Sequence, residues 1–210
     1  IRNWCSELNG ESEAQSILME KAGLDEVFLD ITEEVERQLI DEFDQKYTMI
    51  LEELADLEDE ALEPEALENL ALYDLSWIEN GLNFEGLGEN AISIDDQIPS
   101  NNSSTESHIR MLLGKLRIWK GAQIAKDLRA RLKKDLNFIA SIGIASNKML
   151  AKLVSALYKP DKQTRIEPLA VHLFMQRIPF EKIRMMGGKM GKSGLKGANE
   201  NEAESEPDSD

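Results

Sequence analysis

The chain has 210 residues, of which 41% are hydrophobic and 30% charged, and its formal net charge is −16. This composition predicts one or two globular domains, and no apolar run approaches the roughly 20 residues of a membrane-spanning helix. Cys5 is the only cysteine and there are two histidines, which excludes an intrachain disulfide and argues against a Cys/His zinc site. The N-terminal IRNWCSELNG also lacks the basic and apolar segments of a signal peptide.

The charge is distributed unevenly along the chain. Residues 1–106 hold 4 Lys and Arg against 29 Asp and Glu, residues 107–196 hold 20 against 5, and the last 14 residues hold none against 6. The net charge alone argues against a nucleic-acid partner, but the separate basic region is suited to face phosphate groups. The sequence therefore predicts two regions of opposite charge followed by an acidic tail.

The first clear element is the β-rich run Leu24 to Ile31, which predicts a strand, or a hairpin with Asp25 and Glu26 near its bend. The segment before it is expected to be helical, with residues 17–19 entering a strand. Thr32 is expected to cap a helix, with acidic residues in its first turn. The apolar side of that helix is predicted to consist of Val35, Leu39, Ile40 and Phe43.

Residues 51–107 are predicted to form an acidic, largely disordered insert. LEELADLEDEALEPEALE is interrupted by Pro64, and residues 80–107 are rich in Gly, Asn and Ser. Such a segment buries too little apolar surface to offset its ordering entropy, although a short helix is expected around residues 70–78. The insert is interpreted either as a partner-binding loop or as a tolerated solvated insertion.

A long basic amphipathic helix is predicted over residues 108–138, with Gly114 and Gly121 as weak points. Its apolar stripe consists of Leu112, Leu113, Leu116, Trp119, Ile124, Leu128 and Leu132.

The apolar run FIASIGIA, residues 138–145, predicts a buried strand, and Ser146 is expected to cap a helix that ends at Pro160. A strand, a polar turn and a helix N-terminus in this order form a natural anion site. Residues 169–176 are predicted to be helical, and IPFEKIRMMGGKMG to form a helix and a Gly-rich turn before an acidic, disordered tail.

Adjacent carboxylates at a strand bend offer the hard oxygen ligands that Mg²⁺ prefers, and two-metal phosphoryl transfer uses such groups. The pair alone is unspecific, because DE recurs at Asp41 and Asp59. Its surroundings are more specific. EKAGLDEVFLDIT resembles the second acidic motif of the Y-family of translesion DNA polymerases, and GIASNKMLAKLVSALYKPDKQT is similar to their Gly-Ile, Asn-Lys, Leu-Ala-Lys, Lys-Pro and Gln-Thr pattern. IPFEKIRMMGGKMG resembles the thumb segment of the eta type, and the whole resemblance covers residues 17–43 and 109–192.

The resemblance implies roles for single residues. Asp25 would be a shared ligand of two Mg²⁺ ions, Glu26 a ligand of the ion that activates the primer 3′-hydroxyl, and Lys159 a contact of the incoming triphosphate. Asp30 matches the motif but is expected to make a structural hydrogen bond. The resemblance also places Lys148 near the nucleotide. The residues that it places near the DNA backbone are Asn147, Lys152, Gly187, Gly188 and Lys189. The alternative interpretation of the helix lysines is that they form a solvated face of the helix.

The chain also departs from the family pattern. Gly23 and Leu24 stand where Ser and Ile are usual, and the family's first acidic motif has no match before Asp25. Two carboxylates from one bend are not enough to hold two Mg²⁺ ions. The chain is therefore interpreted as a fragment or an incomplete gene model, and we expect it not to extend primers by itself.

The predicted fold is α+β, with part of a mixed or antiparallel polymerase palm sheet, flanking helices and part of a helical thumb. The resemblance implies a DNA-directed DNA polymerase acting in translesion synthesis in the nucleus, with Mg²⁺ as cofactor and primer-template DNA and deoxynucleotide triphosphates as ligands. Rival interpretations are a non-catalytic module that binds DNA backbone and an acidic module that binds a basic protein. The predicted segments are partial palm 1–50, insert 51–107, remaining palm 108–168, partial thumb 169–193 and disordered tail 194–210.

Overall fold

The computed structural model describes residues 17–56, 75, 77–78, 82, 90–93, 105–179 and 182–183. The chain divides into two compact units, Ile1–Ala170 and Val171–Asp210. The class is α+β, as predicted. The elements in chain order are β1 (Leu18–Lys21), β2 (Val27–Asp30), α2 (Thr32–Asp56), β3 (Asn90–Ile92), α5 (Thr105–Leu136), β4 (Ile142–Ile144), α6 (Lys148–Ser155), β5 (Gln163–Ile166) and α7 (Ala170–Arg177).

β1 and β2 form an antiparallel hairpin. Leu18 lies opposite Asp30 and Lys21 opposite Val27. β1 is exposed along its length, whereas the first three residues of β2 are half-buried. The hairpin that the sequence allowed is therefore present, and its turn carries the adjacent Asp and Glu.

The side chain of Asp30 hydrogen-bonds the first residue of α2, and Thr32 is not the cap of this helix. Oδ1 of Asp30 accepts hydrogen bonds from the backbone nitrogen of Thr32 at 3.0 Å and from its hydroxyl at 2.6 Å. The first helical hydrogen bond runs from the Val35 nitrogen to the Ile31 carbonyl at 2.8 Å, so Thr32 is already inside the helix and its predicted capping role is wrong. The Thr32 hydroxyl, followed by its N–H, lowers the pKa of Asp30 because both donors favour the charged carboxylate. The structural hydrogen bond expected for Asp30 is confirmed.

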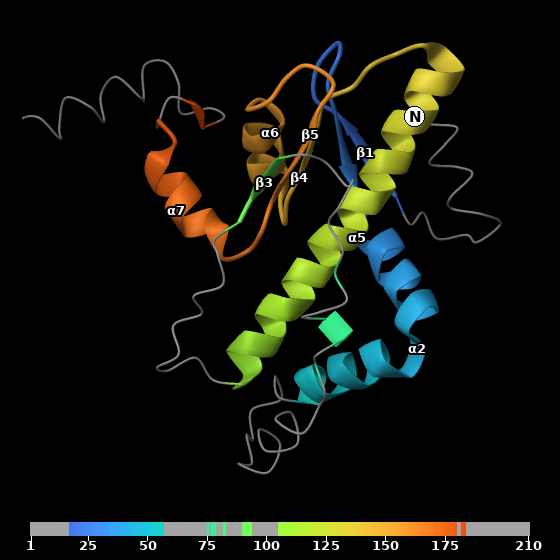
Figure 1. Ribbon diagram of the computed structural model, residues 1–210, viewed down its shortest axis with the longest axis vertical. Coiled ribbons are helices and arrows are strands. Elements are labelled where there is room, and N and C mark those ends of the chain that lie inside the picture. The colour runs from blue at the N-terminus through green and yellow to red at the C-terminus, as the bar shows by residue number, and fades with distance from the viewer. Residues whose placement is uncertain are drawn as a thin grey trace, which may run out of the picture. The chain divides into compact units, whose positions relative to one another are not determined.

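Asp44 bends α2, as Figure 1 shows. Its backbone has φ 42° and ψ −122°, in a region that L-residues other than glycine rarely adopt. Residues from both sides of the bend, including Leu39 and Tyr47, join one core cluster with residues of α5. Ile40 is 43% exposed, so its predicted place in the apolar face is wrong.

Three parts of the predicted insert 51–107 are regular structure, and the prediction of disorder is wrong for them. α2 continues to Asp56, β3 occupies residues 90–92, and α5 begins at Thr105. Leu54 is buried and prolongs the helical spacing set by the buried Ile50, so burial offsets the ordering cost there. β3 is stabilised by its pairing with β5, and a pairing between strands so far apart in the chain cannot be predicted from local sequence patterns.

α5 is the long basic helix that the sequence predicted, and its apolar stripe is buried in full. Burying one such side chain contributes about 1.5–3 kcal/mol, so the stripe is a main source of stability for this unit. Gly114 is a place of close approach and not merely a weak point, because a Cβ there would lie 2.9 Å from Cγ of Pro168. At Gly121 a Cβ would lie 3.4 Å from Cγ2 of Ile144, which is an ordinary contact.

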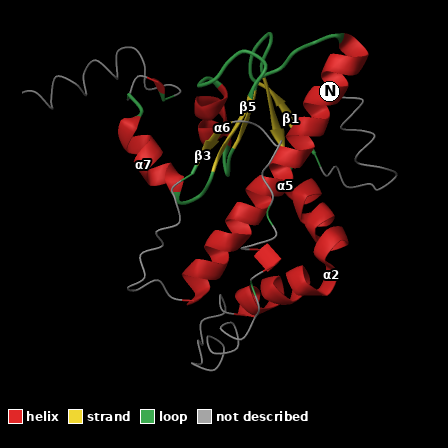
Figure 2. Cartoon of the chain, in the orientation of Figure 1, coloured by secondary structure: helices red, strands yellow, loops and turns green. Residues whose placement is uncertain are grey.

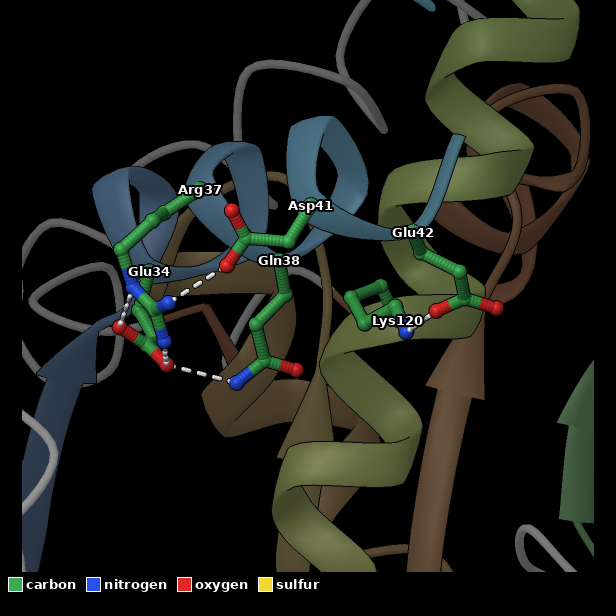
Figure 3. A network of polar contacts seen from close by, with 6 residues as sticks. All are labelled: Glu34, Arg37, Gln38, Asp41, Glu42 and Lys120. Carbon is green, nitrogen blue, oxygen red and sulfur yellow. Dashed lines mark hydrogen bonds and ion pairs between the residues drawn. The ribbon is translucent and has the colours of Figure 1, made fainter. Parts of the chain in front are cut away.

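Charged side chains connect α2 to α5. Nζ of Lys120, whose side chain is 6% exposed, pairs with Glu42 and lies 4.9 Å from the ring centroid of Trp119. Nε of Arg117 donates to Oε1 of Glu36 at 2.6 Å. Figure 3 shows the Lys120–Glu42 pair bridging the two helices.

A second polar cluster in Figure 3 lies along α2 itself. Glu34 is fully buried, and its Oε1 accepts from Nη2 of Arg37 at 2.7 Å and from Nε2 of Gln38 at 2.6 Å. Nη1 of Arg37 also pairs with Asp41 at 2.8 Å. Burying the carboxylate is tolerable because these donors compensate for the water that it loses.

β4, α6 and β5 form a strand–helix–strand unit with parallel strands (Figure 2), and β5 lies between β3 and β4. All four residues of β5 are buried. Gly143 of β4 faces α6 so closely that a Cβ would lie 1.9 Å from the Ala151 carbonyl oxygen. The absence of a side chain there allows the helix to pack on the strand.

Two expectations about the strands are corrected. A mixed or antiparallel sheet was predicted, but within the described ranges the strands form one antiparallel hairpin and a separate parallel sheet. The predicted strand over residues 138–145 is shorter, because Phe138 and Ile139 are 59% and 53% exposed and only residues 142–144 pair.

α7 begins at the last residue of the first unit and otherwise belongs to the second. It confirms the helix predicted at residues 169–176. Within the part of the chain that the structure describes, no helix combines the length and apolar character that a bilayer crossing requires.

Candidate functional site

The hairpin turn presents Asp25 and Glu26 to solvent. The Glu26 carbonyl accepts hydrogen bonds from the backbone nitrogens of Ala22 at 3.0 Å and Gly23 at 3.3 Å, which close the turn. Both acidic side chains are exposed. The strand pairing of β1 and β2 thus fixes where the two adjacent carboxylates emerge.

Two lysines of α6 meet carboxylates of the hairpin. Nζ of Lys152 pairs with Oε2 of Glu26, and Nζ of Lys148 pairs with Oε2 of Glu20 at 3.0 Å. Lys148 and Lys152 are four residues apart, so they lie on the same side of the helix. The structure therefore brings together Glu26, Lys148 and Lys152, which the motifs had singled out. They come from segments far apart in the sequence.

Asn147 caps α6, and the Ser146 cap that the sequence predicted is wrong. Oδ1 of Asn147 accepts from the Leu150 nitrogen at 2.9 Å, and its backbone is extended, as an N-cap residue requires. The side-chain oxygen of Asn147 therefore has a structural partner within its own helix.

Lys159 lies beyond α6, in an exposed segment that leads to β5. Arg129 of α5, which the sequence did not single out, anchors this segment. Its Nη2 donates to the carbonyl of Asp161 at 2.6 Å and to Oδ1 of that residue at 2.7 Å, and its Nε donates to the Ala140 carbonyl at 3.1 Å. The Arg129 hydrogen bond also lowers the pKa of Asp161. No sequence signal distinguished Arg129 from the other basic residues of α5, because its partial burial depends on the packing of distant segments.

Gly187, Gly188 and Lys189 lie outside the described residues. Asp25, Glu26, Lys148 and Lys152 are grouped at the hairpin and α6, whereas Lys159 follows α6 in the segment that leads to β5.

The turn fits a magnesium ion in donor chemistry but not a pair of ions. Mg²⁺ is commonly held by one or two carboxylates together with water and substrate phosphate, and Asp25 and Glu26 offer two exposed carboxylates on neighbouring positions. No group of three or more His, Cys, Asp or Glu suited to a metal occurs among residues that the structure describes. By donor chemistry, Asp25 and Glu26 are the residues at this turn that could hold a single ion together with water and substrate phosphate.

Comparison with known proteins identifies the family. Over residues 7–156 the chain matches the impB/mucB/samB family, and it belongs to this family of Y-family DNA polymerases. The match covers the hairpin, α2, β3, α5, β4 and the whole of α6, and it ends before β5.

Individual relatives support the eta type that the motifs indicated. DNA polymerase eta of Arabidopsis thaliana is 30% identical over 180 residues, which cover 86% of this chain and 23% of the relative. DNA polymerase eta of Drosophila melanogaster is 29% identical over 182 residues, covering 83% and 18%. DNA polymerase iota of Homo sapiens is 33% identical over 106 residues, covering 49% and 13%. The chain thus spans only about a fifth of the length of the two eta relatives.

Proposed function

We propose that this chain carries part of the catalytic machinery of an eta-type polymerase that adds nucleotides opposite damaged DNA, in the nucleus. The observation that supports this most is the meeting of the Asp25–Glu26 turn with the lysine side of α6. Carboxylates beside ammonium groups suit a site that binds a metal ion and a triphosphate together. Residues 1–50 and 108–168 would be palm and residues 169–193 thumb.

Asp25 and Glu26 are proposed as magnesium ligands. When bound, the ion neutralises triphosphate charge and activates the attacking hydroxyl. The chain's own contribution is to fix both carboxylates in the turn that Ala22 and Gly23 close by backbone hydrogen bonds. Further ligands must come from outside the described residues, because these two carboxylates do not make a two-metal site.

Cationic and backbone groups are proposed to bind phosphate. Lys159 and Lys148 are assigned to the deoxynucleotide triphosphate, and their ammonium groups would act as charge-assisted donors. The residues assigned to the backbone of primer-template DNA are Asn147, Lys152, Gly187, Gly188 and Lys189. These contacts are independent of DNA sequence and weaken as salt is raised.

Nucleotide binding by the purified chain tests the proposal. A fluorescent deoxynucleotide triphosphate should bind in a Mg²⁺-dependent manner, and Asp25→Asn or Lys159→Met should each weaken binding about tenfold, the size of one charge-assisted contact. Binding that is independent of Mg²⁺ and unchanged by Asp25→Asn would contradict the metal-site assignment and favour a non-catalytic DNA-binding module.

Primer extension gives a second test. We expect no extension by the 210-residue chain alone, because its two assigned carboxylates cannot hold both ions. Extension that requires Mg²⁺ and is abolished by Glu26→Gln would show that the chain is sufficient for catalysis.

A further inference from the structure

The ion pairs between the hairpin and α6 are alike in kind but differ in position. Lys148 pairs with Glu20, which lies in β1, whereas Lys152 pairs with Glu26, which lies in the turn beside Asp25. The Lys152 and Glu26 side chains are 39% and 43% exposed, and those of Lys148 and Glu20 are 61% and 56% exposed. One lysine thus contacts a carboxylate assigned to the metal, and its neighbour on the same helix contacts one that is not.

The geometry points to Lys152 as a resident cation of the metal site, whose ammonium group occupies Glu26 and competes with the divalent ion for it. This inference rests on the proposed function, in which Glu26 is a magnesium ligand. It gives Lys152 a role in setting metal affinity, beyond the contact with DNA backbone assigned above.

α6 keeps this ammonium group close to the turn. The helix is capped by Asn147 and packs on β4 where Gly143 leaves no room for a side chain. Its buried residues Leu150, Leu153 and Val154 fix its orientation, so Lys152 remains on the side that faces Glu26. A tethered cation is present at a constant local concentration, unlike an ion taken from solution.

The competition is expected to be moderate. Both partners of the Lys152–Glu26 pair are partly exposed, and exposed ion pairs change an equilibrium by about two- to fivefold. A divalent ion carries twice the charge of an ammonium group, so it displaces the lysine once its concentration is high enough. Removal of the Lys152 charge should therefore tighten metal binding by about two- to fivefold.

Mn²⁺ titration of the full 210-residue chain, followed by the electron paramagnetic resonance signal of free Mn²⁺, measures this effect. Lys152→Met should bind about two- to fivefold more tightly than the wild type, whereas Lys152→Arg, which keeps the charge, should bind as the wild type does. Lys148→Met is the matched control and should gain less, because its partner Glu20 is not assigned to the metal. In a Glu26→Gln background, which removes the carboxylate that Lys152 occupies, Lys152→Met should give no gain.

The outcomes separate this inference from the proposed function. If Asp25→Asn abolishes tight Mn²⁺ binding but Lys152→Met equals the wild type, the competition is refuted and the metal site stands. Equal gains for Lys152→Met and Lys148→Met would also refute it, since they would reflect net charge alone. Binding that is absent from every variant, or unaffected by Asp25→Asn, would overturn both proposals.

Discussion

The α2–α5 interface and the hairpin–α6 contact both use ion pairs, but they differ in the burial of the lysine. The Lys120 side chain between α2 and α5 is 6% exposed although its partner Glu42 is 43% exposed, whereas Lys152 and Glu26 at the hairpin are 39% and 43% exposed. Removing the partner of a buried ammonium group leaves an uncompensated charge, but exposed pairs contribute little. The Lys120 pair therefore fixes α2 against α5 more strongly than the Lys152 pair fixes the hairpin against α6.

The largest expected effect comes from Gly143, which tests whether packing or charge positions α6. Gly143→Ala would bring a Cβ to 1.9 Å from the Ala151 carbonyl oxygen, so the strand and helix must separate. We expect the free energy of unfolding to fall by about 3 kcal/mol, as measured by urea denaturation followed by circular dichroism. Gly23→Ala is the control, because a Cβ there would lie 3.9 Å from Cβ of Glu26, an ordinary van der Waals contact. Equal losses in the two variants would contradict the tight packing of α6.

The charge comparison itself is tested by removing one carboxylate from each region. Glu42→Ala takes away the partner of the buried Lys120, and we expect a loss of about 2 kcal/mol in the free energy of unfolding, less than for a fully buried pair because the Glu42 side chain is 43% exposed. Glu20→Ala takes away the partner of the exposed Lys148 and should cost about 0–1 kcal/mol. Urea denaturation followed by tryptophan fluorescence measures both, and a loss at Glu20 as large as that at Glu42 would remove the distinction between the regions.

A smaller effect, dependent on pH, is expected at the junction of the two regions. Asp30 accepts a hydrogen bond from the first backbone nitrogen of α2, and Asp30→Ala should cost about 1 kcal/mol at neutral pH, the size of a helix-capping contact. Its folded-state pKa lies below the ordinary 3.8, so this contribution is present above that pH and is lost as pH falls through the lower folded value.

The free energy of unfolding, measured at pH 6 and at pH 2–3, compares the charged form of the Asp30 carboxyl group with its increasingly protonated form. The difference in stability between the wild type and Asp30→Ala should narrow at the lower pH. Thr32→Val, which removes only the hydroxyl donor, should lose part of the pH dependence and keep the backbone bond. A difference that stays constant with pH would show that the charge of Asp30 does not matter.

Local patterns predicted the elements whose burial follows helical spacing or whose turn is short. The stripe of α5 and the Asp25–Glu26 hairpin are of this kind. The residues that hydrogen-bond the starts of the helices were predicted less well. Asp30 and Asn147 each lie within two residues of a Thr or Ser that also suits a helix start, and only the backbone conformation decides which residue takes this role. Ile40 fits the spacing of α2 but faces solvent, since the axis bends nearby at Asp44.

The parallel sheet and the site contacts could not be read from local patterns. β5 has the sequence QTRI, whose polar residues are nevertheless buried between two neighbouring strands. Gln163 obtains a hydrogen bond from its side-chain nitrogen to the Ala122 carbonyl of α5 at 3.0 Å, a partner that no sequence window contains. Lys152 and Glu26, which pair with each other, also lie far apart in the sequence, although the family motifs had marked both residues.

The central place of β5 has a consequence for how the chain is made. Asn90 of β3 pairs with Thr164, and Ile142 of β4 pairs with Gln163, so both earlier strands share the strand that is synthesised last. During translation neither can gain its sheet hydrogen bonds until β5 has left the ribosome, whereas the hairpin is complete once residue 30 has emerged. A nascent chain halted before Gln163 would therefore carry the hairpin with its Asp25–Glu26 turn, but without the completed parallel sheet on which α6 packs.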